Sequence, residues 1–138
     1  MQRTLVLVKP DGVRRGLVGE VIRRFEARQL QIKALKLVGP NRDLMERHYL
    51  VHRDKPHFQA MVDFMVSGPV VAMILEGEQA IGLVRQMLGA LEPLEAAPGT
   101  IRGDLTISVR ANLVHGSDSP ESAETEIAVW FRPEEILP

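Results

Sequence analysis

The most reactive group that the sequence offers is the imidazole of a histidine in the last quarter of the chain. His115 ends an apolar run and is followed by the small residues Gly116 and Ser117. A neutral imidazole is a competent nucleophile near neutral pH, because the reference pKa of histidine is about 6.5. Small neighbours leave room for a bulky substrate. A lone histidine is more often structural, so a catalytic interpretation depends on its partners.

Glu126 is the expected partner of this histidine. It lies on a predicted helix, at the margin of an inward apolar stripe formed by Ala123, Ile127 and Trp130. A carboxylate there can turn back toward the strand end that carries His115, fix the imidazole tautomer and favour a cationic phosphoimidazole. The hydroxyl of Ser117 could orient that carboxylate. The alternative is an ordinary solvated glutamate on a helix.

Three basic residues are candidates for neutralising a phosphate substrate. Lys9 closes an apolar strand, where an ammonium group suits the mouth of a cleft better than the core. Arg102 lies between small or flexible neighbours at the end of a long loop, 89–104, and could bind a ligand in bidentate geometry. Arg85 lies on a helix whose apolar residues face inward. Either arginine could instead be an ordinary surface residue.

The elements that must position these side chains can be predicted from the spacing of apolar residues. Apolar runs predict strands at 4–9 and 69–75, alternation of apolar and polar residues predicts another at 31–38, and residues 107–115 return to a β-like composition. Helical spacing predicts helices at 17–28, at 80–88 and from Ser119-Pro120 to about Phe131. Residues 43–66 hold two helical segments, broken near Lys55-Pro56. A turn at Pro10-Asp11-Gly12 ends the first strand.

This order mixes strands and helices without strict alternation. It favours an α+β fold of the ferredoxin-like, split β-α-β kind over a doubly wound sheet. The expected architecture is a sandwich with an antiparallel four-stranded sheet and added helices. With 138 residues, 45% of them hydrophobic and 25% charged, the chain is expected to form a single domain over residues 1–138.

Composition excludes several classes of function. The chain has no cysteine, which excludes disulfides, thiolate catalysis and cysteine-based zinc sites. A formal net charge of −1 gives no general attraction for nucleic acid or a membrane surface. The first apolar run is too short to span a bilayer, and no targeting signal is evident. We therefore expect a cytoplasmic protein without a membrane or a specific nucleic acid as partner.

Competing catalytic motifs are missing. The sequence has no G-x-x-x-x-G-K-[ST] loop, no G-x-G-x-x-G fingerprint and no G-x-S-x-G elbow, which argues against P-loop, dinucleotide-binding and serine-hydrolase chemistry. His48, His52 and His57 are too scattered to predict a metal site, and H-E-x-x-H is absent.

Four segments together resemble the nucleoside diphosphate kinase family. These segments are Thr4–Val13 (TLVLVKPDGV), Ser67–Met73 (SGPVVAM), Pro98–Asp104 (PGTIRGD) and Asn112–Ser119 (NLVHGSDS). They occur in the family's order, and the resemblance covers essentially the whole chain. Four segments in that order are far more specific than any one of them.

The resemblance implies a ping-pong transfer of the terminal phosphoryl group from a nucleoside triphosphate to a nucleoside diphosphate through phosphorylated His115. It implies that Lys9, Arg85 and Arg102 hold phosphates and that Asn112, with Lys9, reads the sugar hydroxyls. It further implies that Ser117 and Glu126 support the imidazole and that Tyr49 lines the phosphate end. Mg²⁺ would bridge the nucleotide phosphates with few or no protein ligands. The assembly would be a tetramer or a hexamer, built from a shared dimer.

Two positions depart from the family pattern. His57 stands where the family usually stacks a phenylalanine on the nucleobase, and Leu91 stands where a threonine usually contacts a phosphate. Neither is the nucleophile, so the departures bear on nucleotide affinity. A register shift of the loop is a second explanation for Leu91.

Two other functions are the main alternatives. A ferredoxin-like RNA-binding module needs exposed aromatic residues on its sheet. Here Phe25, Phe64 and Phe131 fall on predicted helical faces, which argues against such a module. A low-turnover family member acting as a nucleotide-binding regulator is the remaining alternative, and His57 and Leu91 keep it open.

Overall fold

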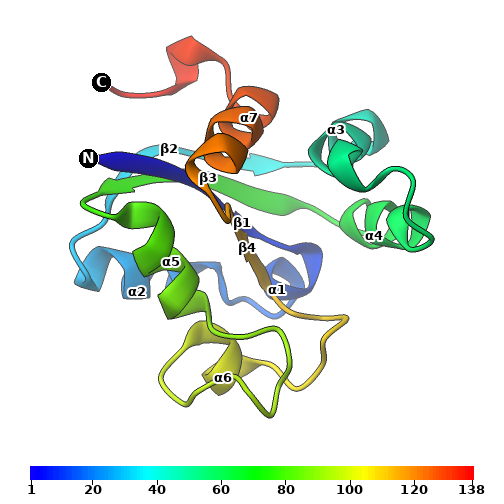
Figure 1. Ribbon diagram of the computed structural model, residues 1–138, viewed down its shortest axis with the longest axis horizontal. Helices are drawn as coiled ribbons and strands as arrows, with labels where there is room; N and C mark the ends of the chain where they lie inside the picture. The colour runs from blue at the N-terminus through cyan, green and yellow to red at the C-terminus, as the bar shows by residue number, and fades with distance from the viewer.

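The computed structural model describes residues 1–138, and its strands and helices alternate irregularly along the chain (Figure 1). The elements, in order, are β1 (Gln2–Val8), α1 (Pro10–Arg14), α2 (Val18–Ala27), β2 (Gln31–Val38), α3 (Arg42–His48), α4 (Phe58–Met65), β3 (Val70–Gly77), α5 (Ala80–Leu88), α6 (Ile101–Leu105), β4 (Val114–Gly116) and α7 (Pro120–Trp130). Short 3₁₀ turns at Leu50–His52 and Pro133–Glu135 complete the set.

The four strands form one antiparallel sheet in the order β2-β3-β1-β4. β1 and β3 pair along their whole length, from Gln2 opposite Gly77 to Val8 opposite Val71. β4 is much shorter and adds three residues to the other edge of β1. The predicted α+β, ferredoxin-like arrangement with an antiparallel four-stranded sheet is confirmed.

Helices cover both faces of this sheet (Figure 1). α2 and α5 pack on one face, where Phe25 and Val84 are fully buried. α3, α4 and α7 pack on the other face, around Met45 and Val62. Since both faces are covered, every residue of β1 from Leu5 to Val8 is buried. The strand therefore reads as a continuous apolar run rather than an alternating one.

Two local predictions are wrong, one at Pro10 and one at the end of the long loop. Pro10 does not open a turn but is the first residue of helix α1, because the φ angle of proline is already helical and its missing N–H is not needed there. The long loop ends at residue 100 rather than 104, and α6 begins at Ile101. The side chain of Thr100 accepts a hydrogen bond from the Gly103 amide and so caps this helix.

The β-like stretch 107–115 is also corrected, because only residues from Val114 onward join the sheet. Ile107 is 95% exposed, so the apolar residues of this segment face no core. Leu113 has a φ of 74°, a left-handed conformation that a strand does not contain and that costs on the order of 1–3 kcal/mol. A carboxylate oxygen of Asp11 accepts from the Leu113 amide at 3.0 Å, and the Lys9 amide donates to the Leu113 carbonyl at 2.8 Å. These bonds hold the segment before β4 against the end of β1.

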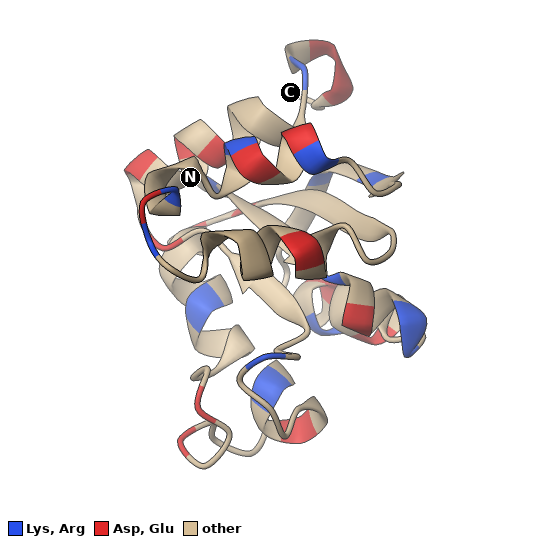
Figure 2. Cartoon of the chain, turned by 90° about the vertical axis from the view of Figure 1, so that its right-hand side faces the viewer, with Lys and Arg blue, Asp and Glu red and all other residues tan.

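Charged residues of both signs are interspersed over the face that Figure 2 presents, as expected for a chain with a net charge of −1. None of the helices combines the length and the apolar content that a bilayer crossing requires.

Candidate active site

His115 is the middle residue of β4 and pairs with Leu7 of β1. Paired residues of an antiparallel ladder point to the same face of a sheet, so its side chain lies on the face that α3 and α7 cover. The short strand reaches this position because the next residue is a glycine. A Cβ atom on Gly116 would lie 2.9 Å from the Leu88 side chain of α5. Close packing of β4 on α5 thus presents the imidazole on the opposite face.

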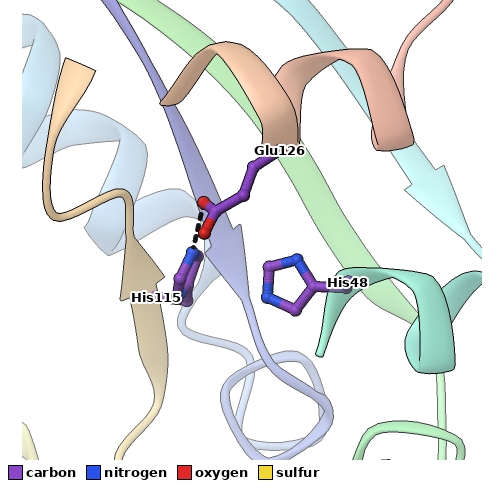
Figure 3. Close-up of side chains that lie close together, drawn as sticks. All are labelled: His48, His115 and Glu126. Atoms are coloured by element: carbon purple, nitrogen blue, oxygen red, sulfur yellow. Dashed lines mark hydrogen bonds and ion pairs between the residues drawn. The ribbon is translucent and has the colours of Figure 1, made fainter. Parts of the chain in front are cut away.

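A carboxylate from α7 supports the imidazole, as Figure 3 shows. Nε2 of His115 lies 2.8 Å from Oε1 of Glu126, and the same oxygen accepts the hydroxyl proton of Ser117 at 2.7 Å. The Ser117 oxygen in turn accepts from the Leu5 amide of β1 at 3.3 Å. α7 begins as predicted, with Ser119 as cap and Pro120 as first residue, and this start determines where Glu126 falls along the helix.

Glu126 is ionised in this arrangement. Burial acts to raise the pKa of Glu126, but the hydrogen bonds and charge of His115 and the hydroxyl of Ser117 outweigh burial and lower it. An ionised carboxylate can only accept hydrogen bonds. Nε2 of His115 must therefore carry the proton, which leaves the lone pair on Nδ1. No protein group bonds to Nδ1.

Arg102 differs from the solvated loop arginine considered above. It lies in α6 with 5% of its surface exposed, and it donates to three backbone carbonyls. Nε donates to Asn112 at 3.1 Å, Nη1 to Gly89 at 2.9 Å and Nη2 to Val114 at 2.7 Å. Burial, with the charge of Arg85, lowers the pKa of Arg102 to about 10, so the guanidinium remains charged at neutral pH. It connects both ends of the 89–112 segment to β4.

Lys9 lies beside the same segment, directly after β1. Its ammonium donates to Oδ1 of Asn112 at 2.9 Å. Burial, followed by the charge of Arg102, lowers the pKa of Lys9 to about 8, with Asp11 opposing. Arg85 of α5 donates to the carbonyl of Gly116 at 3.2 Å, next to His115. The structure thus gathers these three cations around the end of β4.

Tyr49, His57 and Leu91 are the remaining predicted site residues. Tyr49 follows α3, and burial, with the charge of Glu126, raises the pKa of its phenol to about 12. His57 precedes α4 and is exposed, and Leu91 is half exposed in the segment after α5. No hydrogen bond or ring contact joins His57 or Leu91 to the His115 group.

Sequence reasoning missed His48, the last residue of α3. One ring nitrogen of His48, one of His115 and a carboxylate oxygen of Glu126 lie within 4.8 Å of one another (Figure 3). A signal was available, because His48 falls on the buried stripe of α3 with Leu44 and Met45. A polar side chain on such a stripe needs a specific partner.

These three residues resemble a metal site, but their hydrogen bonds do not suit one. The indole Nε1 of Trp130 donates to Nδ1 of His48 at 3.0 Å. An indole N–H only donates, so Nδ1 has used its lone pair and Nε2 carries the proton. A metal would require the lone pair that Nε2 lacks. Ligation by His48 would therefore break a buried hydrogen bond.

Comparison with known proteins places this geometry in a family. The family model for nucleoside diphosphate kinase matches residues 2–136. The chain belongs to the nucleoside diphosphate kinase family. Two curated relatives of that name, from Archaeoglobus fulgidus and Thermus thermophilus, are 57% and 55% identical over 137 residues. Those matches cover 99% of this chain and 91% and 100% of the relatives.

Solved structures agree with this assignment. A nucleoside diphosphate kinase family protein from Babesia bovis superimposes with a TM-score of 0.97 at 46% identity, over 100% of this chain and 93% of that chain. A halophilic nucleoside diphosphate kinase from Halobacterium salinarum, solved in complex with CDP, gives 0.95 at 45% identity, over 99% and 91%. The protein is accordingly a phosphotransferase that moves the terminal phosphoryl group between nucleotides. Neither the low-turnover regulator nor the RNA-binding module is favoured.

Proposed function

We propose that the phosphoryl group passes through Nδ1 of His115 in a ping-pong reaction. The observation that carries this proposal is the bond between His115 Nε2 and Glu126 Oε1, at 2.8 Å. It commits the ring to the tautomer with its lone pair on Nδ1, which no protein group occupies. A nucleophile held in one tautomer by a carboxylate is the arrangement that other histidine-centred sites use.

In the first half-reaction, Nδ1 attacks the terminal phosphorus of a nucleoside triphosphate. The new bond joins nitrogen and phosphorus, the bond to the bridging oxygen breaks, and the electron pair leaves with the nucleoside diphosphate. The phosphorylated ring is cationic while Nε2 keeps its proton, and the Glu126 carboxylate balances that charge. A second nucleoside diphosphate attacks the phosphorus, and the electrons return to Nδ1.

The neighbouring cations would hold the phosphates of the nucleotide. Lys9, Arg85 and Arg102 are the proposed phosphate ligands, and their shared position around β4 supports the role. A guanidinium has five N–H groups, and Arg102 uses three of them on carbonyls, which leaves two for a phosphate. Asn112, already bonded to Lys9, would read the sugar hydroxyls, and Tyr49 would line the phosphate end.

The nucleotide is expected to carry Mg²⁺ between its phosphates as part of the substrate. The residues around His115 fit this arrangement better than a resident metal. Glu126 is the carboxylate bonded to His115, and its Oε1 already accepts two hydrogen bonds. Asp11 and Asp118 are further carboxylates in the neighbourhood, and each lies near a cation, Lys9 and Arg85 respectively. Magnesium that keeps its water and binds mainly to phosphate oxygens needs no further protein ligand.

The test is transfer of label from γ-labelled ATP and magnesium to the protein. We expect an acid-labile, alkali-stable label on the wild type and none on His115→Ala, with both proteins equally folded by circular dichroism and thermal melting. Mapping of the labelled peptide under alkaline conditions identifies the residue. Undiminished labelling of His115→Ala, or a label on another side chain, would overturn the mechanism.

We also propose that the chain forms one domain and assembles as a homo-oligomer, a tetramer or hexamer, in the cytoplasm. β2 is an edge strand, and Leu35 and Leu37 on it are 49% and 66% exposed, which supports pairing with a second copy. The lack of cysteines is compatible with a reducing compartment. Light scattering of Leu37→Lys, against wild type, tests the assembly: the variant should dissociate if β2 is the contact.

A further inference from the structure

His48 has no part in the mechanism above, although it lies beside the nucleophile. It is 8% exposed on the buried stripe of α3 and packs between Tyr49, Trp130 and His115. A buried histidine is expected to have its polar atoms satisfied. One of its two nitrogens has a protein hydrogen bond, and the other has none.

The first nitrogen determines the protonation of the ring. Trp130 donates to Nδ1 at 3.0 Å, so the proton of the neutral ring is on Nε2. Burial, with the charge of His115 as the next cause, lowers the pKa of His48 to about 3. Glu126 acts in the opposite direction, and Lys9 and His52 add to the lowering. The ring is therefore neutral, in a single tautomer, at neutral pH.

The second nitrogen is turned toward His115 (Figure 3). The centroids of the two rings are 4.7 Å apart and their planes are inclined by 84°. An edge-to-face contact of this kind brings the positive edge of one ring to the negative face of the other. The edge that His48 presents carries the Nε2 proton, which strengthens the match.

This contact restrains a motion that the Glu126 bond leaves free. Nε2 of a histidine lies nearer the axis of the Cβ–Cγ bond than Nδ1 does. Rotation about that bond therefore moves Nδ1 farther than it moves the nitrogen bonded to Glu126. A group packed on the face of the His115 ring opposes that rotation directly.

We propose that His48 is a positioning residue for phosphoryl transfer: its Nε2–H edge, held by Trp130, keeps the His115 ring turned so that Nδ1 meets the nucleotide. The role rests on the proposed function of His115. It requires no proton transfer by His48, whose protonation state is the same before and after each half-reaction.

Two substitutions of His48 separate this role from simple packing. In His48→Asn the amide oxygen can still accept from Trp130, but no N–H edge reaches His115. In His48→Gln the longer side chain can bring an amide N–H close to where Nε2–H stood. The measurement is the rate of single-turnover phosphorylation of His115 by MgATP in a rapid-quench experiment, together with the affinity for ADP from titration calorimetry.

We expect His48→Asn to slow phosphorylation roughly 10- to 100-fold, the scale of a small misplacement of a reacting atom, with ADP affinity within about twofold of wild type. His48→Gln should recover part of the rate. A wild-type rate in His48→Asn, an equal loss in both variants, or a loss confined to ADP affinity would overturn the proposal.

A third measurement does not depend on these variants being folded. Nitrogen-15 NMR of the wild type should find His48 with Nε2 protonated and Nδ1 unprotonated, and the opposite tautomer would overturn the proposal. Trp130→Phe, which removes the indole donor and leaves the His48 side chain unchanged, should also slow phosphorylation. The site of the label separates the two hypotheses, because wild-type label on a residue other than His115 contradicts the proposed function, whereas slow labelling of His115 bears on His48 alone.

Discussion

Arg102 should contribute to stability as well as to nucleotide binding, because its guanidinium joins parts of the chain that are distant in sequence. Removal of its side chain in Arg102→Ala takes hydrogen bonds from the carbonyls of Gly89, Asn112 and Val114. Two consequences follow. The free energy of unfolding falls, and the segment that carries Asn112 is no longer held against β4.

The expected size of the loss follows from these contacts. A hydrogen bond to a charged group contributes about 1.5–3 kcal/mol net, so three of them set an upper bound near 4.5–9 kcal/mol. The cost of burying the guanidinium opposes that gain. We therefore expect Arg102→Ala to lower the free energy of unfolding by about 3–5 kcal/mol, the range for disrupting a buried charged network. Arg102→Lys should lose somewhat less than Arg102→Ala, because its ammonium keeps a charge and part of the hydrogen bonding, although it cannot reach all three carbonyls.

Urea denaturation without nucleotide, at one protein concentration, measures this loss, provided that the m-value is unchanged. Arg28→Ala is the matched control, since Arg28 directly follows α2, is exposed and makes no side-chain hydrogen bond. It should change stability by less than about 0.5 kcal/mol. An Arg102→Ala variant as stable as the control, but with lost ADP affinity, would refute the reasoning and leave Arg102 as a phosphate ligand alone.

Three further predictions concern the nucleophile and the nucleotide. Glu126→Gln should slow phosphoryl transfer roughly 10- to 1,000-fold with little change in ADP affinity, as measured by rapid quench and calorimetry. A large loss of ADP affinity with a normal transfer rate would contradict the role of Glu126 as support for the imidazole. Leu91→Thr should tighten ADP binding by up to about 1.5–3 kcal/mol, the contribution of one hydrogen bond to a charged group, and His57→Phe should tighten it by about 1 kcal/mol. Equal or weaker binding in Leu91→Thr would mean that the loop lies in another register or that another group already contacts the phosphate there. Because the pKa of Lys9 is about 8, its ammonium is present below that pH and lost above it, so affinity for the anionic nucleotide should fall as pH rises through about 8. Lys9→Arg should flatten that calorimetric profile, and an unchanged profile would show that another group titrates.

The sequence predicted what depends on local pattern. The strand at the start of the chain and the last helix follow from apolar spacing and from the Ser119-Pro120 cap, and the position of Glu126 beside His115 follows from that helix. The prediction of β-structure over residues 107–113 is wrong because apolar composition is local, whereas exposure depends on which strand lies alongside. Arg102 could not be assigned its carbonyl partners, since Gly89 and Asn112 approach it only in the folded chain.

His48 shows the same limit for a residue that the sequence did not single out as part of the site. Its partners, Trp130 and His115, lie on α7 and β4, and the residues next to it in sequence carry no sign of either. The usable signal was a histidine at a position where the helix buries Leu44 and Met45. A buried polar residue of this kind predicts that a partner exists but does not identify it.

On the proposed phosphate-binding roles, the contrast between Arg102 and Lys9 would let one site be both rigid and open to substrate. A guanidinium spreads its donors over a plane, so Arg102 can hold three carbonyls and still present N–H groups to a phosphate. An ammonium is a compact charge, and Lys9 uses a single contact to Asn112. We therefore expect loss of the Lys9 proton near pH 8 to loosen the site less than exchange of Arg102 for lysine does. On the proposed phosphate-binding roles, stability and phosphate binding are coupled through Arg102 and separable at Lys9.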